Sequence, residues 1–168
     1  SSDVCSSDLP ASLRKQWNLE LLDKFNIPSV IVDQRYFKEQ LANGRTNPFE
    51  QDNVIICSYQ FLHNQKDLAK LIKWDLAIID EAHKLRNAYR QSNRIGQRIR
   101  WGTEDRKKLL LTATPLQNTL MELYGLSTLI DDRLFGEPAS FRSQYLNQGG
   151  DLSGLRDRLK TFCWRTLR

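Results

Sequence analysis

Apolar residues fall along the chain in two kinds of stretch: short unbroken runs, and longer stretches in which they recur with a helical period. The short runs predict four strands, and three of them are apolar enough to be covered on both faces, as parallel strands are. These strands occupy residues 29–33, 53–58, 75–80 and 107–112. The longer stretches predict helices over residues 12–25, 35–42, 59–73, 86–100, 118–130, 140–146 and 152–162, with Ser58 as N-cap of the third.

The alternation of strands and helices predicts an α/β fold with a parallel sheet. After residue 112 no further strand is predicted, so the remainder of the chain is expected to be a helical C-terminal extension. In open parallel sheets the reactive side chains gather where strands end and helices begin. Functional residues are therefore expected at the ends of the predicted strands.

Composition narrows the class of protein. The chain has 168 residues, 40% of them hydrophobic, which suffices for one domain with a single core and argues against a disordered or fibrous chain. The longest apolar runs, such as residues 54–57 and 109–111, are far shorter than the roughly 18 residues of a membrane-spanning helix, so no membrane segment is expected. The three cysteines are widely spaced, which argues against a disulfide framework and a thiolate zinc site.

The formal net charge of +5 is compatible with a polyanionic partner. The segment 84–108 carries nine basic residues and two acidic ones, a local surplus larger than that of the whole chain. Within it, arginines recur every four residues and form one ridge on a predicted helix, at Arg86, Arg90, Arg94 and Arg98. Two interpretations stay open: the ridge contacts a phosphate backbone, or it is a solvated face.

An acidic motif follows the third predicted strand directly, as Asp80-Glu81-Ala82-His83. An apolar strand that ends in a carboxylate is how nucleotide-hydrolysing sheets hold Mg²⁺, so Asp80 is expected to bind the metal through its water shell. Glu81 is placed to orient the attacking water, and His83 to hydrogen-bond to a group that senses the γ-phosphate. The alternative is that Asp80 only caps the helix that follows.

The fourth predicted strand also ends in polar residues. It runs into Thr112-Ala113-Thr114-Pro115, which brings two hydroxyl groups to the end of the strand. These threonines are placed to relay the state of a bound nucleotide. The alternative is a simple strand end, at which Pro115 prevents continuation.

With these two motifs, residues 10–168 resemble the superfamily-two helicases, and more narrowly the Swi/Snf-type DNA translocases. Leu116-Gln117-Asn118, after the fourth strand, is typical of that branch. Pro10-Ala11-Ser12-Leu13 with Gln16-Trp17 resembles its motif Ia, and Cys57-Ser58-Tyr59 resembles its motif Ib. Because the two polar strand ends occur in the order of this family, we favour their functional interpretation.

The resemblance implies a RecA-like parallel sheet sandwiched by helices and a parent protein that hydrolyses ATP with Mg²⁺ while moving on double-stranded DNA. It implies a second RecA-like lobe in the same parent chain, and a location with the DNA, in the nucleoid of a prokaryotic cytoplasm or in a nucleus. It assigns hydrolysis to Asp80, Glu81 and His83. The coupling of hydrolysis to movement falls to Thr112, Thr114 and Gln117. The expected DNA contacts are Ser12, Gln16, Ser58, Arg86, Arg90 and Arg94.

None of the eight glycines is followed by lysine, so these 168 residues contain no phosphate-binding G-x-x-x-x-G-K-[ST] loop. We therefore expect the RecA-like lobe to be incomplete, without its first strand and P-loop, and the chain alone to be inactive. The alternative is a natural non-catalytic module that binds DNA or docks on a partner. A third candidate, the motor subunit of a restriction enzyme, is disfavoured by Gln16-Trp17 and Leu116-Gln117-Asn118.

The expected organisation has three parts. Residues 3–9 resemble the translation of a sequencing-adapter oligonucleotide, so residues 1–9 are expected to be foreign to the protein. Residues 10–130 are expected to form the partial ATP-binding lobe, and residues 131–168 a helical extension toward the second lobe. The four tryptophans are interpreted as core or lobe-packing residues, Cys57 as a buried thiol, and His63 as a residue without a second metal ligand.

Overall fold

The computed structural model describes residues 11–165. The segment 1–9, expected to be foreign, lies outside them, as do Pro10 and residues 166–168. In chain order the elements are α1 (Ala11–Phe25), β1 (Ser29–Ile31), α2 (Gln34–Ala42), β2 (Val54–Ile56), α3 (Tyr59–Asn64), α4 (Lys66–Lys70), β3 (Ala77–Ile79), the 3₁₀ helix η1 (Ala82–Leu85), α5 (Arg94–Gly102), β4 (Lys108–Leu110), α6 (Leu120–Ile130), α7 (Pro138–Phe141), the π-helical turn η2 (Arg142–Leu146) and α8 (Leu152–Leu159).

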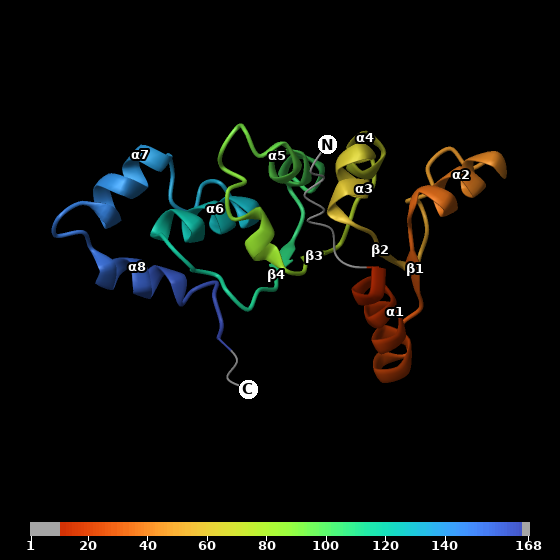
Figure 1. Ribbon diagram of the computed structural model, residues 1–168, viewed down its shortest axis with the longest axis horizontal. Coiled ribbons are helices and arrows are strands. Elements are labelled where there is room, and N and C mark those ends of the chain that lie inside the picture. The colour runs from red at the N-terminus through yellow and green to blue at the C-terminus, as the bar shows by residue number, and fades with distance from the viewer. Residues whose placement is uncertain (1–10, 166–168) are drawn as a thin grey trace, which may run out of the picture.

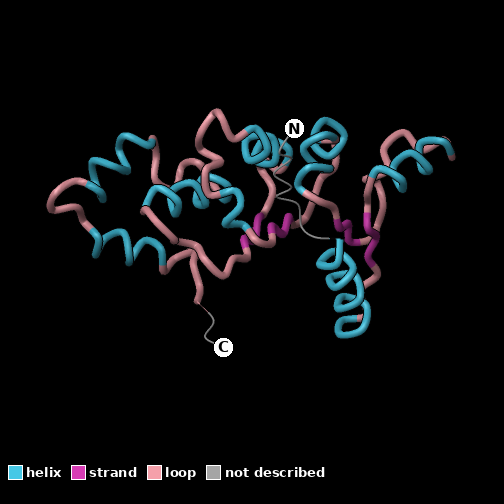
Figure 2. The backbone as a smooth tube through the Cα atoms, in the orientation of Figure 1, coloured by secondary structure: helices cyan, strands magenta, loops and turns pink. Residues whose placement is uncertain are grey.

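The four strands lie inside their predicted ranges, but each is only three residues long. They pair in parallel as two separate sheets, β1 with β2 and β3 with β4. In the second pair Ile79 stands opposite Leu110, so both strands end at the same edge. Figure 2 shows the two magenta pairs along the middle of the molecule. The predicted α/β class with parallel strands is therefore confirmed, as two short pairs rather than one continuous sheet.

Helices cover the strands unevenly. In Figure 1, α3, α4 and α5 lie on one side of the strands, α1 lies on the other side beside β1 and β2, and α6 to α8 extend the molecule beyond β4. The side-chain amide of Asn18 attaches α1 to β1, because it donates to the carbonyl and the hydroxyl of Ser29, both at 2.9 Å. On β3 and β4 the facing side chains of Ile78 and Leu109 remain 50% and 45% exposed, so the expectation that both faces are covered is wrong there.

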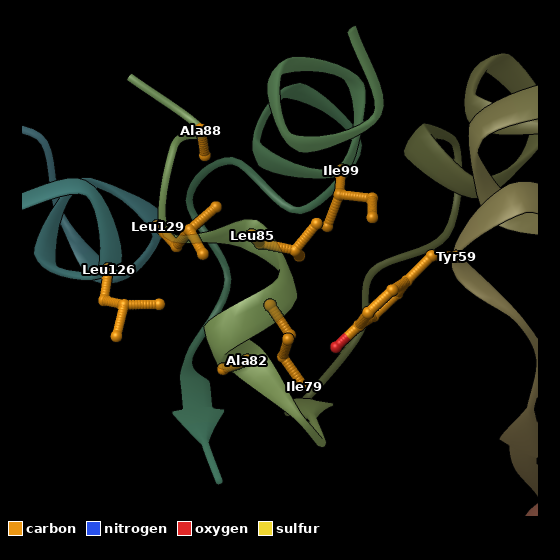
Figure 3. Packing of buried hydrophobic residues seen from close by; sticks show 8 residues of the cluster. All are labelled: Tyr59, Ile79, Ala82, Leu85, Ala88, Ile99, Leu126 and Leu129. Atoms are coloured by element: carbon orange, nitrogen blue, oxygen red, sulfur yellow. The ribbon is translucent and has the colours of Figure 1, made fainter. Parts of the chain in front are cut away.

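The central cluster of buried side chains joins the end of β3 to the helices around it (Figure 3). It gathers residues from α3, β3, η1, α5 and α6 and from the turn after η1. Its members are Tyr59, Ile79, Ala82, Leu85, Ala88, Ile99, Leu126 and Leu129. Because these residues belong to five elements, the cluster sets where the chain that follows β3 lies.

Two further clusters are rich in aromatic rings. Phe37 packs against Phe49 and Phe61 near β1 and β2, with ring centroids 5.3 and 5.4 Å apart. In the helical extension, Phe141 packs against Tyr124 of α6 with centroids 5.0 Å apart. The rings meet tilted or edge-on, the arrangement that aromatic quadrupoles favour. The predicted C-terminal helices are therefore packed onto α6.

The predicted helix 59–73 is divided in two. Gln65 leaves the helical conformation, with φ −107° and ψ 20°, and this ends α3; its N–H still donates to the Phe61 carbonyl at 3.0 Å, as the C-cap of that helix. α4 then begins at Lys66 without a side-chain cap. Among the described helices, none is both long and apolar enough to cross a membrane.

The predicted helix 86–100 begins only at Arg94. The Asn93 side chain accepts the Gly96 N–H at 2.9 Å and caps α5, while residues 86–92 form turns and a bend. These turns bring Ala88 against Gly96 so closely that a Cβ added to the glycine would lie 2.8 Å from the Ala88 methyl. The packing of Ala88 against Gly96 and the cap at Asn93 therefore place the start of α5 at Arg94, although the periodic pattern of the preceding residues predicts an earlier start.

A close approach between α6 and the turn after η1 gives a test of this packing. A Cβ added to Gly125 would lie 1.7 Å from the Arg86 carbonyl oxygen, a backbone atom that cannot rotate away. We expect Gly125→Ala to lower the free energy of unfolding by about 3 kcal/mol, at the upper end of the usual cost of overpacking. The measurement is the midpoint of urea unfolding.

Gly102→Ala is the matched control, because its added Cβ would meet nothing closer than 3.9 Å. Alanine also has the higher helix propensity, so this variant should be neutral or more stable than the parent chain. Equal midpoints for the two variants would contradict the tight contact between α6 and the Arg86 backbone.

Candidate functional site

The backbone turns sharply at the end of β3, where the predicted acidic residues lie. Asp80 accepts the N–H of Glu81 through Oδ1 at 2.8 Å. Glu81 adopts a left-handed conformation, with φ 51° and ψ 41°, which costs on the order of 1–2 kcal/mol for a residue with a side chain. The next N–H, of Ala82, donates to the Leu111 carbonyl at 2.9 Å and ties the turn to the end of β4. The N-cap residue of η1 is Glu81 rather than Asp80, so the capping alternative is wrong.

Two aromatic side chains from other elements hold Asp80. The indole N–H of Trp17, on α1, donates to its carboxylate Oδ2 at 2.8 Å. The hydroxyl of Tyr59, the first residue of α3, donates to its backbone carbonyl, and Figure 3 shows this ring reaching toward the end of β3. Burial, followed by the nearby charges of Asp80 and Glu81, raises the pKa of Tyr59. The phenol therefore keeps the proton that it donates.

His83 connects the ends of the two strands. Its Nδ1 lies 3.2 Å from Oε2 of Glu81 and 3.5 Å from the hydroxyl oxygen of Thr112. The first distance permits a hydrogen bond when Nδ1 carries the proton, and the second is at the outer limit for one. The Thr112 hydroxyl oxygen also accepts the N–H of Thr114 at 3.2 Å, while the Thr114 residue is exposed. Glu81, His83 and Thr112 are thus brought together as predicted.

A carboxylate on α6 holds the loop that follows β4. Glu122 is 8% exposed and accepts the backbone N–H groups of Gln117 and Asn118 at 2.9 and 3.1 Å. These two donors lower the pKa of Glu122 from its usual value. Arg86, which follows η1, donates to Oε1 of Gln117 at 2.6 Å and lies 3.7 Å from the Glu122 carboxylate. Gln117 is therefore held between α6 and the segment that follows β3.

The expected helical ridge of arginines is wrong. Arg86 and Arg90 lie in the turns before α5, so they share no helix face with Arg94 and Arg98. The guanidinium of Arg90 lies 5.5 Å from the ring centroid of its neighbour Tyr89 and donates to the phenol oxygen at 3.1 Å. Arg90 and Arg94 are exposed, whereas Arg86 is half-buried in its contacts with the loop after β4.

The three serine and glutamine residues expected to contact phosphates are placed differently. Ser12 and Gln16 are exposed on α1, and Gln16 donates to Glu20 at 3.1 Å. Ser58 is only 7% exposed, and its hydroxyl oxygen accepts the Phe61 N–H at 3.1 Å, so it is the predicted N-cap of α3. Ser12 and Gln16 are accessible to a partner, while Ser58 serves the fold.

A magnesium ion fits the end of β3 through its water shell. Among residues 11–165, no group of three His, Cys, Asp or Glu side chains is placed to hold a metal ion. Mg²⁺ usually keeps several waters and uses one or two carboxylates together with substrate phosphates. Oδ2 of Asp80 accepts the Trp17 N–H and Oδ1 accepts the Glu81 N–H, and because each carboxylate oxygen can accept more than one hydrogen bond, the group can also bind metal-bound water. The donor set is compatible with the water-mediated role predicted for Asp80.

The tryptophans differ in how far they pack into the core of this chain. Trp74 packs in the cluster around Phe49, and its N–H donates to the Ala69 carbonyl at 2.9 Å. Trp101 and Trp164 are 42% and 85% exposed, so neither is a core residue of this chain, and packing between lobes stays a prediction for them. Cys57 packs against the same cluster as Trp74, and burial raises the pKa of its thiol to about 12, as expected for a structural residue.

Three residues of the site had no assigned role. A local signal exists for Glu122, because Thr119-Leu120-Met121-Glu122 has the spacing of a capping box, in which a glutamate reaches back to earlier N–H groups. Trp17 and Tyr59 lie 63 and 21 positions from Asp80, so no local pattern reveals their contacts.

Comparison with known proteins places these motifs in a family. Residues 9–168 match the family described as the SNF2-related domain. The RNA polymerase-associated protein RapA of Yersinia enterocolitica is 34% identical over 137 residues, which are 79% of this chain and 14% of the relative. RapA of Erwinia tasmaniensis is 36% identical over 138 residues, again 79% and 14%. The chain thus spans about one seventh of the length of these curated relatives.

The fold is similar to that of a solved structure, the SWI2/SNF2 ATPase core of Sulfolobus solfataricus in complex with double-stranded DNA. The TM-score is 0.72 at 21% sequence identity, and the match covers 94% of this chain and 32% of the other. At this identity the similarity concerns the fold. It confirms the expected architecture, an α/β lobe of RecA-like type that is present in part.

The low pKa of Glu122 leads to a prediction about stability and pH. Because this pKa lies below the usual value of 4.5, the carboxylate stabilises the folded state fully above about pH 4.5 and loses this effect as the pH falls through the folded-state pKa. Glu122→Gln should therefore unfold at lower urea concentration at pH 7, with the difference from the parent shrinking toward pH 3.

The control for this prediction is Glu39→Gln, which changes the same charge at an exposed position on α2. We expect it to leave the pH dependence of the unfolding midpoint unchanged. A Glu122→Gln chain with the stability of the parent from pH 3 to pH 7 would show that this carboxylate does not hold the loop after β4.

Proposed function

The chain belongs to the SNF2-related domain family, and from that premise we propose that it forms part of the first RecA-like lobe of an ATP-dependent translocase on double-stranded DNA. The observation that carries the proposal is the convergence of the ends of β3 and β4. His83 lies within 3.5 Å of both Glu81 and Thr112, so residues of the acidic motif and of the threonine motif are in contact. If the threonine motif is to respond to a nucleotide held by the acidic motif, residues of the two motifs must touch, and His83 provides this contact.

Each group at these strand ends has a role in the proposal. Asp80 holds a magnesium ion through its waters, and this ion, when bound, neutralises charge on the phosphates of ATP. Glu81 orients the attacking water and accepts a hydrogen bond from His83 when Nδ1 of that ring is protonated. Thr112 meets His83 from the end of β4. Together with Thr114 and Gln117, it passes the state of the nucleotide toward α6.

The DNA contacts that we propose lie on α1 and near α5. Ser12 and Gln16 are exposed on α1, and Arg90 and Arg94 are exposed before and at the start of α5. Hydroxyls, amides and guanidinium groups are typical contacts of the phosphate backbone and carry no base preference. The solved protein with a similar fold was in complex with double-stranded DNA, which supports duplex as the ligand to test.

Residues 10–130 make up the partial ATP-binding lobe in this proposal, and residues 131–168 a helical extension toward a second lobe. These 168 residues contain no G-x-x-x-x-G-K-[ST] loop. Its backbone N–H groups and lysine hold the β- and γ-phosphates in P-loop enzymes. We propose that the hydrolysing enzyme is a longer parent protein and that this chain alone is inactive.

ATP hydrolysis is the first test of this proposal. The 168-residue chain should release no phosphate from ATP above background, with or without duplex DNA, because its sequence contains no P-loop to hold the phosphates. A natural protein that contains the segment together with a P-loop should hydrolyse ATP faster when duplex DNA is added.

In that protein Glu81→Gln should lower the rate at least about 100-fold, the usual effect of losing a group that acts on the attacking water. Glu39→Gln, at an exposed position on α2, is the control and should leave the rate unchanged. DNA-stimulated turnover by the 168-residue chain would refute its inactivity. A longer protein with no DNA-stimulated turnover would refute the translocase and favour the binding-module alternative.

DNA binding by the chain itself is the second test of this proposal. Its affinity for duplex DNA should be measured by fluorescence anisotropy between 50 and 200 mM salt, a range over which the Debye length shortens from about 14 to about 7 Å. We expect the affinity to fall as the salt concentration rises, because the phosphate contacts release counterions. Arg90→Ala with Arg94→Ala should lower the slope of log affinity against log salt by about one to two.

The matched control removes two positive charges elsewhere, with Lys24→Ala and Arg133→Ala. Both side chains are paired with acidic neighbours on the surface, Lys24 with Glu20 and Arg133 with Asp131. If the two double variants lower the slope equally, binding follows net charge and these arginines form no specific contact with phosphate.

A further inference from the structure

The carboxylate of Asp80 is held by a donor from a distant part of the chain. Trp17 donates its indole N–H to Oδ2 at 2.8 Å, and the Glu81 N–H donates to Oδ1, also at 2.8 Å. With one donor on each oxygen, the plane of the carboxylate is fixed from two sides. The Tyr59 hydroxyl holds the backbone carbonyl of the same residue. Both the side chain and the main chain of Asp80 are therefore constrained.

Packing alone does not account for the position of Trp17. The residue is half-buried and belongs to none of the three clusters of buried side chains found within residues 11–165. By contrast, Trp74 also donates its N–H to an oxygen, but it packs in the cluster around Phe49. The contact that distinguishes Trp17 is its hydrogen bond to a carboxylate, which is stronger than one to a neutral acceptor.

The same bond joins two parts of the fold. α1 is attached to β1 by Asn18, the residue next to Trp17, whereas Asp80 follows β3 in the other strand pair. α1 also carries Ser12 and Gln16, the exposed residues proposed to contact DNA. A displacement of α1 would therefore move the indole donor relative to the Asp80 carboxylate.

We propose that Trp17 is a positioning residue, whose indole N–H orients the Asp80 carboxylate for the metal-bound waters and makes that orientation depend on the position of α1. The inference rests on the proposed function, since it concerns the use of Asp80 in ATP hydrolysis. Trp17 touches neither substrate nor metal and acts only through Asp80. Groups that orient metal ligands in this way typically change metal affinity or activity 10- to 100-fold when they are removed.

The bond itself can be tested in the 168-residue chain without nucleotide or metal. Solvent exchange of the indole N–H protons, followed by NMR, should be slower for Trp17 than for the 85% exposed Trp164. Asp80→Ala should speed the exchange of the Trp17 proton at least about ten-fold and leave that of Trp74 unchanged. Equal exchange of Trp17 and Trp164 in the parent chain, or no effect of Asp80→Ala, would overturn the proposal.

The role is tested in the longer protein with Trp17→Phe, which keeps an aromatic ring and removes the donor. We expect the Mg²⁺ concentration for half-maximal ATP hydrolysis to rise, or kcat to fall, by about 10- to 100-fold, with KM for ATP changed less than about three-fold. Replacement of Trp17 by benzothienylalanine, which exchanges only the N–H for sulfur, should reproduce this effect without a change in ring size.

Trp74→Phe is the matched control, because it also removes an indole donor that bonds to the protein at 2.9 Å. It should leave both the Mg²⁺ dependence and kcat unchanged. If the Trp17 and Trp74 variants behave alike, Trp17 only contributes to stability and the inference fails. If the unmodified longer protein shows no DNA-stimulated hydrolysis, the proposed function fails, and the exchange measurement still decides whether the indole holds Asp80.

Discussion

The parallel pairing of β3 with β4 determines where the candidate catalytic groups lie. Because Ile79 and Leu110 stand opposite each other, the residues after them leave the pair at one edge. The left-handed turn at Glu81 then lets the next N–H reach the carbonyl that follows β4. Ile79 and Ala82 pack in the central cluster on either side of this turn, so burial of apolar surface offsets its conformational cost.

Three helices contact this edge through single polar side chains. Trp17 from α1 and Tyr59 from α3 bond to Asp80, and Glu122 from α6 bonds to the loop after β4. The strand pair thus supplies the chemical groups, while the helices supply their orientation. Hydrogen bonds of one side chain from each helix therefore connect otherwise separate helices to one edge of the strand pair.

The sequence was most informative where a pattern is local. Strand positions, the Ser58 cap and the residues of the acidic motif follow from short runs, and the structure confirms the strands and the cap. The arginine ridge was wrong because the period of Arg86, Arg90 and Arg94 says nothing about Ala88, whose packing on Gly96 requires turns. The bond from Trp17 to Asp80 spans 63 positions, and only the folded chain brings the two together.

The uncovered pair of Ile78 and Leu109 also has a consequence for the behaviour of the chain in solution. Side chains of this kind attract one another when two molecules meet, and the strands beside them carry short free edges. The net charge of +5 opposes such encounters by long-range repulsion, which reaches only about 10 Å at 0.1 M salt. We therefore expect concentrated salt solutions to favour self-association of the isolated chain, because they screen this repulsion.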